Sequence, residues 1–459
     1  MKNKLFLTLV ILVFSSSIYA QFKLPAYEKF TLPNGLTVYL MEKKDVPLIS
    51  ISTVFDAGTT KDGLMSGIAS FTAEALKFGT ANYSKSQIDS IFNYYGSNLV
   101  TYSTLDYAGM NATIMKDDFD VLFPVLKEVM ISPTFPESEF EKRKQRWIVE
   151  LDQAKESPRA VIGSYFNKFL FGSNEYGNPV DGTKKSIEEL SNSQIKNFYN
   201  NYYRSGKSAI ALVGDFDISS MKKKIEKEFA AWSKSGMMSV TDITSNESKF
   251  TEPKVYLINK PNATETTFLI GGFGTLMNNS EQTQINVINT ILGGRFTSWL
   301  NDELRVNAGY TYGARSRFAS YKNAGTFYIS TFTATKNTEP AIDLALKTYN
   351  RLFEQGIDEA TLTSAKNYVK GQFPPDFETA GALAGLLTQM FVYDLNDSYI
   401  NNFEKNVDEL TVAKANEIIK KYFPKNNLQF VMIGKASEIK DIVKKYGKVV
   451  EKELTEDSF

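Results

Sequence analysis

The heptapeptide SAIALVG at Ser208–Gly214 is an uncharged, mainly apolar run that ends in glycine, and LQFVMIG at Leu428–Gly434 repeats the pattern 220 residues later. A short apolar run bounded by a turn residue is typical of a buried β-strand. Two further matches, in the same order along the chain, pair Val38–Met41 with Val255–Ile258 and Ile187–Leu190 with Val407–Leu410. Three ordered matches at nearly one offset predict two homologous halves of about 210 residues each.

The residues that precede the first buried run predict the other elements of a half. Lys29–Met41 (KFTLPNGLTVYLM) places an Asn34-Gly35 hairpin turn between two strands. Leu48–Asp56 alternates apolar and polar residues, as a half-buried strand does. Further strands are expected within Leu99–Met115, and long helices over Asp117–Ile131 and Ser138–Ala154. This order predicts an α+β fold in which each half is a mainly antiparallel β-sheet packed with α-helices.

The N-terminus has the features of a secretory signal peptide. Lys2 and Lys4 precede the apolar run Leu5–Phe14, and small residues lead to Ala20, after which we expect cleavage. An uncleaved anchor is disfavoured because this run is too short to span a bilayer. We therefore expect export to the periplasm, with an extracellular destination as the alternative, and a mature chain without a membrane span.

The predicted domains follow from the signal peptide and the duplication. They are a signal peptide at 1–20, an N-terminal domain at 21–232, a linker at 233–249 and a C-terminal domain at 250–459. The linker is assigned to a stretch rich in Ser and Thr and poor in periodic apolar residues.

The composition excludes several kinds of chemistry. The 459 residues include no histidine and no cysteine, so catalytic dyads and triads that use histidine, disulfides and the usual zinc sites cannot form. Lys+Arg and Asp+Glu both number 52. This balance argues against nucleic acid as a main partner, because nucleic-acid binding requires a basic face. Carboxylate, hydroxyl, lysine, arginine and backbone chemistry remain, or binding without chemistry.

One segment resembles the zinc helix of a known family. Gly67–Thr80 (GIASFTAEALKFGT) is similar to the inverzincin segment of the pitrilysin, insulysin and mitochondrial processing peptidase family, in which H-x-x-E-H supplies two zinc ligands and a base. The three motif positions here hold Ser70, Ala73 and Glu74, and Glu150 lies where the family has its third ligand. The resemblance therefore implies that the zinc site is lost and that this chain holds no metal.

Glu74 and Glu150 keep a second interpretation open. They could form a carboxylate pair for a hard divalent cation, although such a site needs more oxygen ligands than two side chains supply. Alternatively, both are solvated side chains on helix surfaces.

A second resemblance lies in the other half. Leu292–Gly313 (LGGRFTSWLNDELRVNAGYTYG) resembles the family segment in which a glycine turn begins a helix that ends in Leu-Arg, with a tyrosine seven residues later. The matched residues are Arg305 and Tyr312, which in the family reach towards substrate at the metal centre of the opposing half or subunit. Otherwise Arg305 is a cation favoured at a helix C-terminus and Tyr312 is ordinary strand packing.

A third segment resembles the family's edge strand, on which extended peptide docks. It is Val100–Asp106 (VTYSTLD), with Val100, Thr101, Tyr102, Ser103 and Thr104 as the expected peptide-binding residues. An edge strand offers free N–H and C=O groups to a peptide backbone of any sequence. An interior sheet strand is the equal alternative, because pairing partners are not visible in a sequence.

The resemblance covers about Pro25 to Tyr446 and implies the processing-peptidase fold, related to that of LuxS metallopeptidases. It implies a catalytically inactive, peptide-binding subunit of an exported heterodimeric zinc metallopeptidase, not an enzyme on its own. The expected partners are a homologous subunit that carries intact H-x-x-E-H and the zinc, and a peptide or unfolded protein as substrate. The alternatives are a non-enzymatic scaffold or assembly protein and a peptide-binding homodimer with the same fold.

Overall fold

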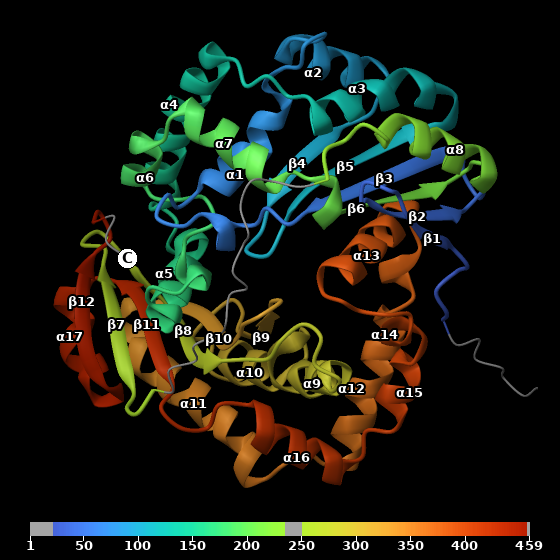
Figure 1. Cartoon of the computed structure of the whole chain (residues 1–459). Coiled ribbons are helices and arrows are strands. Elements are labelled where there is room, and N and C mark those ends of the chain that lie inside the picture. Colours follow the sequence, from blue (N-terminus) through green and yellow to red (C-terminus); the bar gives the residue numbers. More distant parts are fainter. Residues whose placement is uncertain (1–21, 235–249, 457–459) are drawn as a thin grey trace, which may run out of the picture.

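The structure is a computed structural model that describes residues 22–234 and 250–456. The predicted signal peptide at 1–20 lies outside the described residues, as does the predicted linker at 233–249 apart from Ser233 and Lys234. The chain forms two halves, each built on a six-stranded sheet (Figure 1). Within the described residues, none of the helices combines the length and the apolar character that crossing a membrane requires.

The first sheet has the strand order β1-β2-β6-β3-β5-β4. Its strands are β1 (Glu28–Thr31), β2 (Thr37–Glu42), β3 (Leu48–Phe55), β4 (Leu99–Ser103), β5 (Ala108–Met115) and β6 (Ser208–Gly214). Four of the pairs are antiparallel and the β2–β6 pair is parallel. The predicted hairpin joins β1 to β2, and Gly35 provides the positive φ of 89° that the turn needs.

The second sheet has the strand order β12-β7-β11-β8-β10-β9. Its strands are β7 (Lys254–Asn259), β8 (Glu265–Phe273), β9 (Arg315–Ser320), β10 (Gly325–Ala334), β11 (Gln429–Gly434) and β12 (Lys448–Glu453). Three pairs are antiparallel and two are parallel. Five strands repeat the order of the first sheet, with β7, β11, β8, β10 and β9 in place of β2, β6, β3, β5 and β4. The predicted α+β fold of two homologous, mainly antiparallel halves is confirmed.

Helices pack on both sheets. In the first half they are α1 (Ile68–Ala75), α2 (Lys85–Tyr94), α3 (Phe119–Ile131), α4 (Glu137–Ala154), α5 (Pro158–Phe171), α6 (Lys184–Glu189), α7 (Asn192–Tyr202) and α8 (Ile218–Phe229). In the second half they are α9 (Gln282–Asn289), α10 (Trp299–Asn301), α11 (Thr338–Glu354), α12 (Glu359–Gln372), α13 (Ala380–Val392), α14 (Ser398–Asn401), α15 (Phe403–Asp408), α16 (Val412–Tyr422) and α17 (Ala436–Val443). The two long helices expected near 117–131 and 138–154 are α3 and α4.

The halves exchange one helix each. Helix α5 belongs to the first half in sequence but packs on β8 and β11 of the second sheet, where Phe166 lies in one core with Leu269 and Val431. Helix α13 of the second half packs on β3 and β6 of the first sheet, and its Thr388 shares a hydrogen bond of 3.0 Å with Ser52 of β3. Figure 1 shows both helices at the junction between the halves. Each sheet therefore depends on the other half to cover one of its faces.

An ion cluster joins α16 to the start of α9. The Glu281 carboxylate accepts hydrogen bonds from Lys421 Nζ and Tyr422 Oη, both at 2.7 Å, and Lys414 Nζ lies 2.9 Å away. The hydrogen bonds from Lys421, Lys414 and Tyr422 lower the pKa of Glu281 from 4.5 to about 2. The negative charge at this position is also favoured by the N-terminus of α9.

This cluster predicts a pH-dependent effect of Glu281→Gln. Because the pKa of Glu281 is lower in the folded chain, its carboxylate adds stability above pH 4.5, and this contribution is lost as the pH falls towards 2. The variant should be less stable at pH 7 by at most about 1 kcal/mol, since solvent screens the lysines. Urea midpoints of both proteins should converge as the pH falls from 4.5 to 2. A difference that stays constant over this range would contradict the assignment.

Candidate functional site

The helix that would carry the zinc motif, α1, begins at a tight glycine contact. Gly67 has a φ of 90°, and a Cβ there would lie 2.7 Å from the Cα of Gly182. The buried Asp62 carboxylate accepts hydrogen bonds from the backbone N–H groups of Gly67 at 2.7 Å and Ala69 at 3.0 Å. These bonds satisfy free N–H groups at the helix N-terminus and fix where α1 begins.

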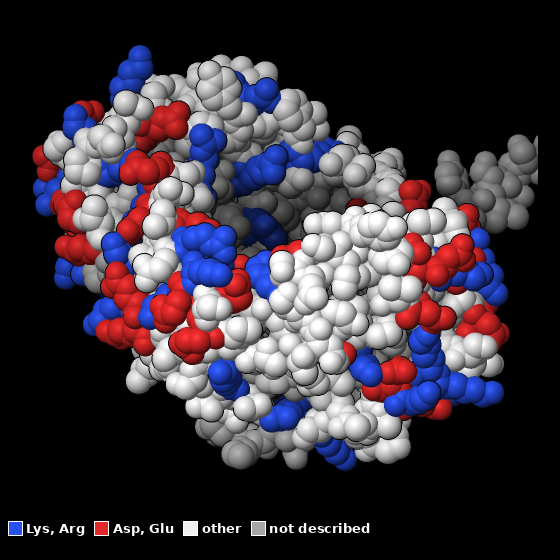
Figure 2. Space-filling view, turned by 90° about the horizontal axis from the view of Figure 1, so that it is seen from above, with Lys and Arg blue, Asp and Glu red and all other residues white. Residues whose placement is uncertain are grey.

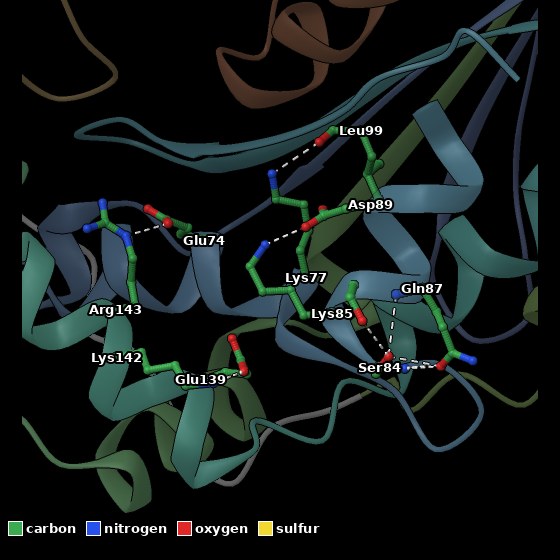
Figure 3. Close-up of polar contacts among 11 residues, drawn as sticks. Glu74, Lys77, Ser84, Lys85, Gln87, Asp89, Leu99, Glu139, Lys142 and Arg143 are labelled. Carbon is green, nitrogen blue, oxygen red and sulfur yellow. Dashed lines mark hydrogen bonds and ion pairs between the residues drawn. The ribbon is translucent and has the colours of Figure 1, made fainter. Parts of the chain in front are cut away.

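The three motif positions on α1 have different surroundings. Ser70 is buried and its Oγ donates a hydrogen bond of 2.7 Å to the carbonyl of Val180. Ala73 is fully buried in the core of the first half. Glu74 keeps 35% of its side chain exposed and points towards α4 (Figure 3). Of the three side chains at the motif positions, Glu74 is therefore the one whose polar group is exposed and can pair with a cation.

That cation is Arg143 of α4. Its Nε donates a hydrogen bond of 2.5 Å to Glu74, and its Nη2 donates one of 2.8 Å to Glu150, two helical turns further along α4. The guanidinium carbon lies 4.5 Å from the ring centre of Trp147, which is one turn along α4 on the same face. Figure 3 shows the Arg143 side chain reaching Glu74 on the neighbouring helix. A guanidinium group thus bridges the two carboxylates that the sequence suggested as a pair for a hard cation.

A third carboxyl lies close to this group. Burial raises the pKa of the Asp181 carboxyl, and the charge of Arg143 opposes that rise. The indole Nε1 of Trp147 donates a hydrogen bond of 3.0 Å to the backbone carbonyl of Asp181, which holds this loop against α4. Among the described residues, no group of three or more carboxylates is arranged to hold a metal ion.

Arg143 is a residue of this site that the sequence patterns do not predict. Its position on α4 could be predicted from the sequence. Arg143, Trp147 and Glu150 are four and three residues apart, so they lie on one face of a helix. Its contact with Glu74 was not readable, since the two residues are 69 positions apart and on different helices.

The predicted peptide-binding strand is at the edge of the first sheet. Strand β4 pairs with β5 alone and covers Val100, Thr101, Tyr102 and Ser103, whereas Thr104 lies just beyond it. Thr104 instead forms the turn into β5, because its N–H donates to the carbonyl of Tyr107 at 2.8 Å.

Backbone groups of β4 point away from β5. Lys77 Nζ donates a hydrogen bond of 3.2 Å to the carbonyl of Leu99 from outside the sheet (Figure 3). In an antiparallel strand alternate residues turn their N–H and C=O groups to the same side, so Thr101 and Ser103 also point outward. Within the described residues, the backbone groups of Thr101 and Ser103 make no hydrogen bond on that side. This edge can therefore accept another strand.

Arg305 and Tyr312 lie in the second half, before β9. Arg305 belongs to a π-helical stretch, η7 (Asp302–Asn307), which continues past the Leu-Arg pair where the sequence placed the helix end. Its guanidinium carbon lies 4.5 Å from the ring centre of Phe296, and Tyr312 is 84% exposed. Tyr312 is thus not ordinary strand packing. Within the described residues, neither side chain is hydrogen-bonded or ion-paired to Glu74 or Glu150.

Phe296 and Tyr312 line a cleft of about 990 Å³, which is also lined by Arg159 and Ile162 of α5. Figure 2 shows a hollow in the molecule, with lysine and arginine side chains gathered around it. The structure therefore places three separate features in one chain, namely the Arg143 bridge, the open edge of β4, and the cleft beside Arg305 and Tyr312.

Comparisons with known proteins agree with this fold. Residues 37–184 match the family model described as insulinase (peptidase family M16), and residues 189–369 match the peptidase M16 inactive domain. An uncharacterized zinc protease of Bacillus subtilis is 22% identical over 357 residues, which cover 77% of this chain and 85% of the relative. An uncharacterized zinc protease of Rickettsia bellii is 24% identical over 317 residues, which cover 67% of this chain and 74% of the relative.

Solved structures show the same architecture. A peptidase M16 inactive domain from Pseudomonas fluorescens superposes with a TM-score of 0.83 at 24% identity, over 89% of this chain and 98% of that one. A protease from Helicobacter pylori gives a TM-score of 0.82 at 20% identity, over 89% of this chain and all of that one. With the two family models spanning well over half of the sequence, the chain belongs to peptidase family M16, and its sequence has none of the histidines of the family's zinc motif.

Proposed function

We propose that this chain is the catalytically inactive, peptide-binding subunit of a heterodimeric zinc peptidase. One observation carries the proposal: in a chain without histidine, the Arg143 guanidinium bridges Glu74 and Glu150, the two carboxylates that by resemblance occupy zinc-ligand positions of the family. The positive side chain here is paired with both carboxylates, and a chain without histidine or cysteine then has no ligand set for a catalytic zinc at this place. Zinc and the activating base then come from a homologous partner subunit with intact H-x-x-E-H.

Two features support a role in handling peptide. The outward backbone groups of Thr101 and Ser103 can pair with an extended peptide whatever its side chains. Within the described residues, the side-chain donors of Arg305 and the exposed Tyr312 make no hydrogen bond or ion pair, and in a partner's site they would hold substrate carbonyls or stabilise an oxyanion. Export to the periplasm, guided by residues 1–20, is part of the same proposal.

Reconstitution tests the proposal. The purified chain alone should contain no stoichiometric zinc and cleave no unfolded protein. Mixed with the zinc-motif homologue from its own genome, it should form a stable complex that cleaves peptide faster than the homologue alone. Stoichiometric zinc in this chain, with activity lost on chelation, would overturn the assignment. A complex in which this chain leaves the partner's rate unchanged would favour a scaffold, and a stable homodimer that binds peptide would favour the third alternative.

The roles of Arg305 and Tyr312 can be separated from assembly. In the reconstituted complex, Arg305→Gln and Tyr312→Phe should each lower kcat about tenfold, because each removes a hydrogen bond to developing charge. The complex should still elute as one species in gel filtration. Arg146→Gln on α4 and Tyr94→Phe on α2 are matched controls, since both residues are exposed, and Tyr94 at 82% resembles Tyr312. Unchanged kinetics in both test variants would contradict the roles given to them.

A further inference from the structure

The cleft beside Tyr312 is unusually rich in arginine. Four of the nine arginines in the chain line it, namely Arg159, Arg295, Arg315 and Arg317, and none of the lining residues is Asp or Glu. They come from three elements that are distant in sequence: the first turn of α5, the loop before α10, and strand β9. Although the chain has equal numbers of basic and acidic residues, four of its arginines are therefore gathered in one concave site.

These arginines have no carboxylate partners. Among residues 22–234 and 250–456, none of the four guanidinium groups has a carboxylate oxygen within 4.0 Å, whereas Arg143 has two. Arg159 lies 4.0 Å from the ring centre of Phe332, and Arg295 donates a hydrogen bond of 3.1 Å to Ser364 Oγ. The cleft therefore holds positive charges that repel one another and are not neutralised within the described chain.

The two arginines of β9 are placed by strand geometry. Residues two apart on a strand lie on one face, so Arg315 and Arg317 both face the cleft, where they pair in register with Ser330 and Tyr328 of β10. Arg317 also lines a second cavity of about 620 Å³ that continues along β9, where Asp376 is the single lining carboxylate. The cations thus line a path along the edge strand of the second sheet.

The duplication provides an internal comparison. In the first half, Val100 and Tyr102 of β4 pair with Asn111 and Gly109 of β5 in the same relation. The first edge therefore presents uncharged side chains where the second presents two arginines. Because both halves share the fold and β4 lacks these charges, the fold itself does not require arginines at these two positions of β9.

We infer that this cleft binds acidic side chains of an extended peptide. Guanidinium groups recognise carboxylates through paired N–H donors, and a concave site strengthens their attraction for anions. A peptide is the occupant favoured here because the open β4 edge already offers backbone pairing within the same molecule. The inference rests on the proposed peptide-binding function and names its substrate class, that is, segments rich in Asp and Glu.

Binding to the purified full chain tests this without a partner subunit. The probes are a short fluorescently labelled peptide with several glutamates, and matched peptides in which glutamines or lysines replace them. The glutamate peptide should bind at least tenfold more tightly than the glutamine peptide, and its affinity should fall as salt is added. Arg315→Val and Arg317→Tyr, which copy the first-half residues, should each weaken it about tenfold. Neither should change the affinity for the glutamine peptide.

The control is Arg146→Gln, which removes an exposed arginine from α4 and should leave all affinities unchanged. Equal binding of the glutamate and glutamine peptides would overturn the inference and leave peptide binding standing. If the chain bound none of the peptides, both the proposed peptide-binding function and this inference would be overturned. A further outcome would also overturn the inference: if single-stranded nucleic acid displaced the labelled peptide and unlabelled glutamate peptide did not, the arginines would bind another class of anion.

Discussion

Replacing Phe166 with alanine should lower the free energy of unfolding by about 3 to 5 kcal/mol, the usual cost of deleting a buried aromatic side chain. Phe166 is 1% exposed, and its ring lies 5.7 Å from that of Tyr328 on β10. It belongs to the first half in sequence but fills the core beneath the second sheet. The cavity should therefore destabilise both halves together, and thermal unfolding should remain a single transition at a lower temperature.

Phe123→Ala is the matched control for that experiment. Phe123 is fully buried and packs on Phe119 and Phe229 within the core of the first half. Its loss should cost a similar amount, whereas native-state hydrogen exchange should separate the two variants. Phe166→Ala should speed exchange in β8 and β11, and Phe123→Ala should speed it in the first sheet. If Phe166→Ala split unfolding into two transitions with the second half unchanged, α5 would not couple the halves.

The fold was predictable where local pattern determines structure. The Asn34-Gly35 turn, the buried run Ser208–Gly214 and its repeat at Leu428–Gly434 are local signals, and the structure has a hairpin and two matching strands there. The exchange of α5 and α13 was not predictable in the same way. Periodicity shows that a helix has an apolar face, but it does not show which sheet covers that face.

The candidate site was likewise predictable only where the signal is local in sequence. The spacing of Ser70, Ala73 and Glu74 predicts that they lie on one helix, and the resemblance to the family identifies them as the positions of its zinc motif. The Arg143 bridge and the arginine cleft depend on residues that the fold brings together from distant segments, as with Arg159 of α5 and Arg317 of β9. A single sequence contains such residues but does not show that they meet.

Replacing Arg143 with methionine should destabilise the chain by about 2 to 3 kcal/mol. Removing one partner of a buried ion pair costs about 3 to 5 kcal/mol because it leaves uncompensated charge. Here Arg143 is 12% exposed, but Glu74 and Glu150 are 35% and 56% exposed and can regain water, which reduces the cost. Methionine retains an apolar side chain to pack against Trp147, so the loss reports mainly on charge. Urea denaturation of both proteins at neutral pH measures it.

Lys142→Met, on the preceding residue of α4, is the control for this prediction. Lys142 forms a solvent-exposed pair with Glu139, three residues earlier (Figure 3), and its loss should change stability by less than about 1 kcal/mol. Glu74→Gln and Glu150→Gln, added to Arg143→Met, should recover much of the lost stability, because neutral side chains need no cation between them. If the triple variant were no more stable than Arg143→Met, packing rather than charge would explain the loss. Recovery would instead show that Arg143 stabilises this site by offsetting the negative charge of Glu74 and Glu150.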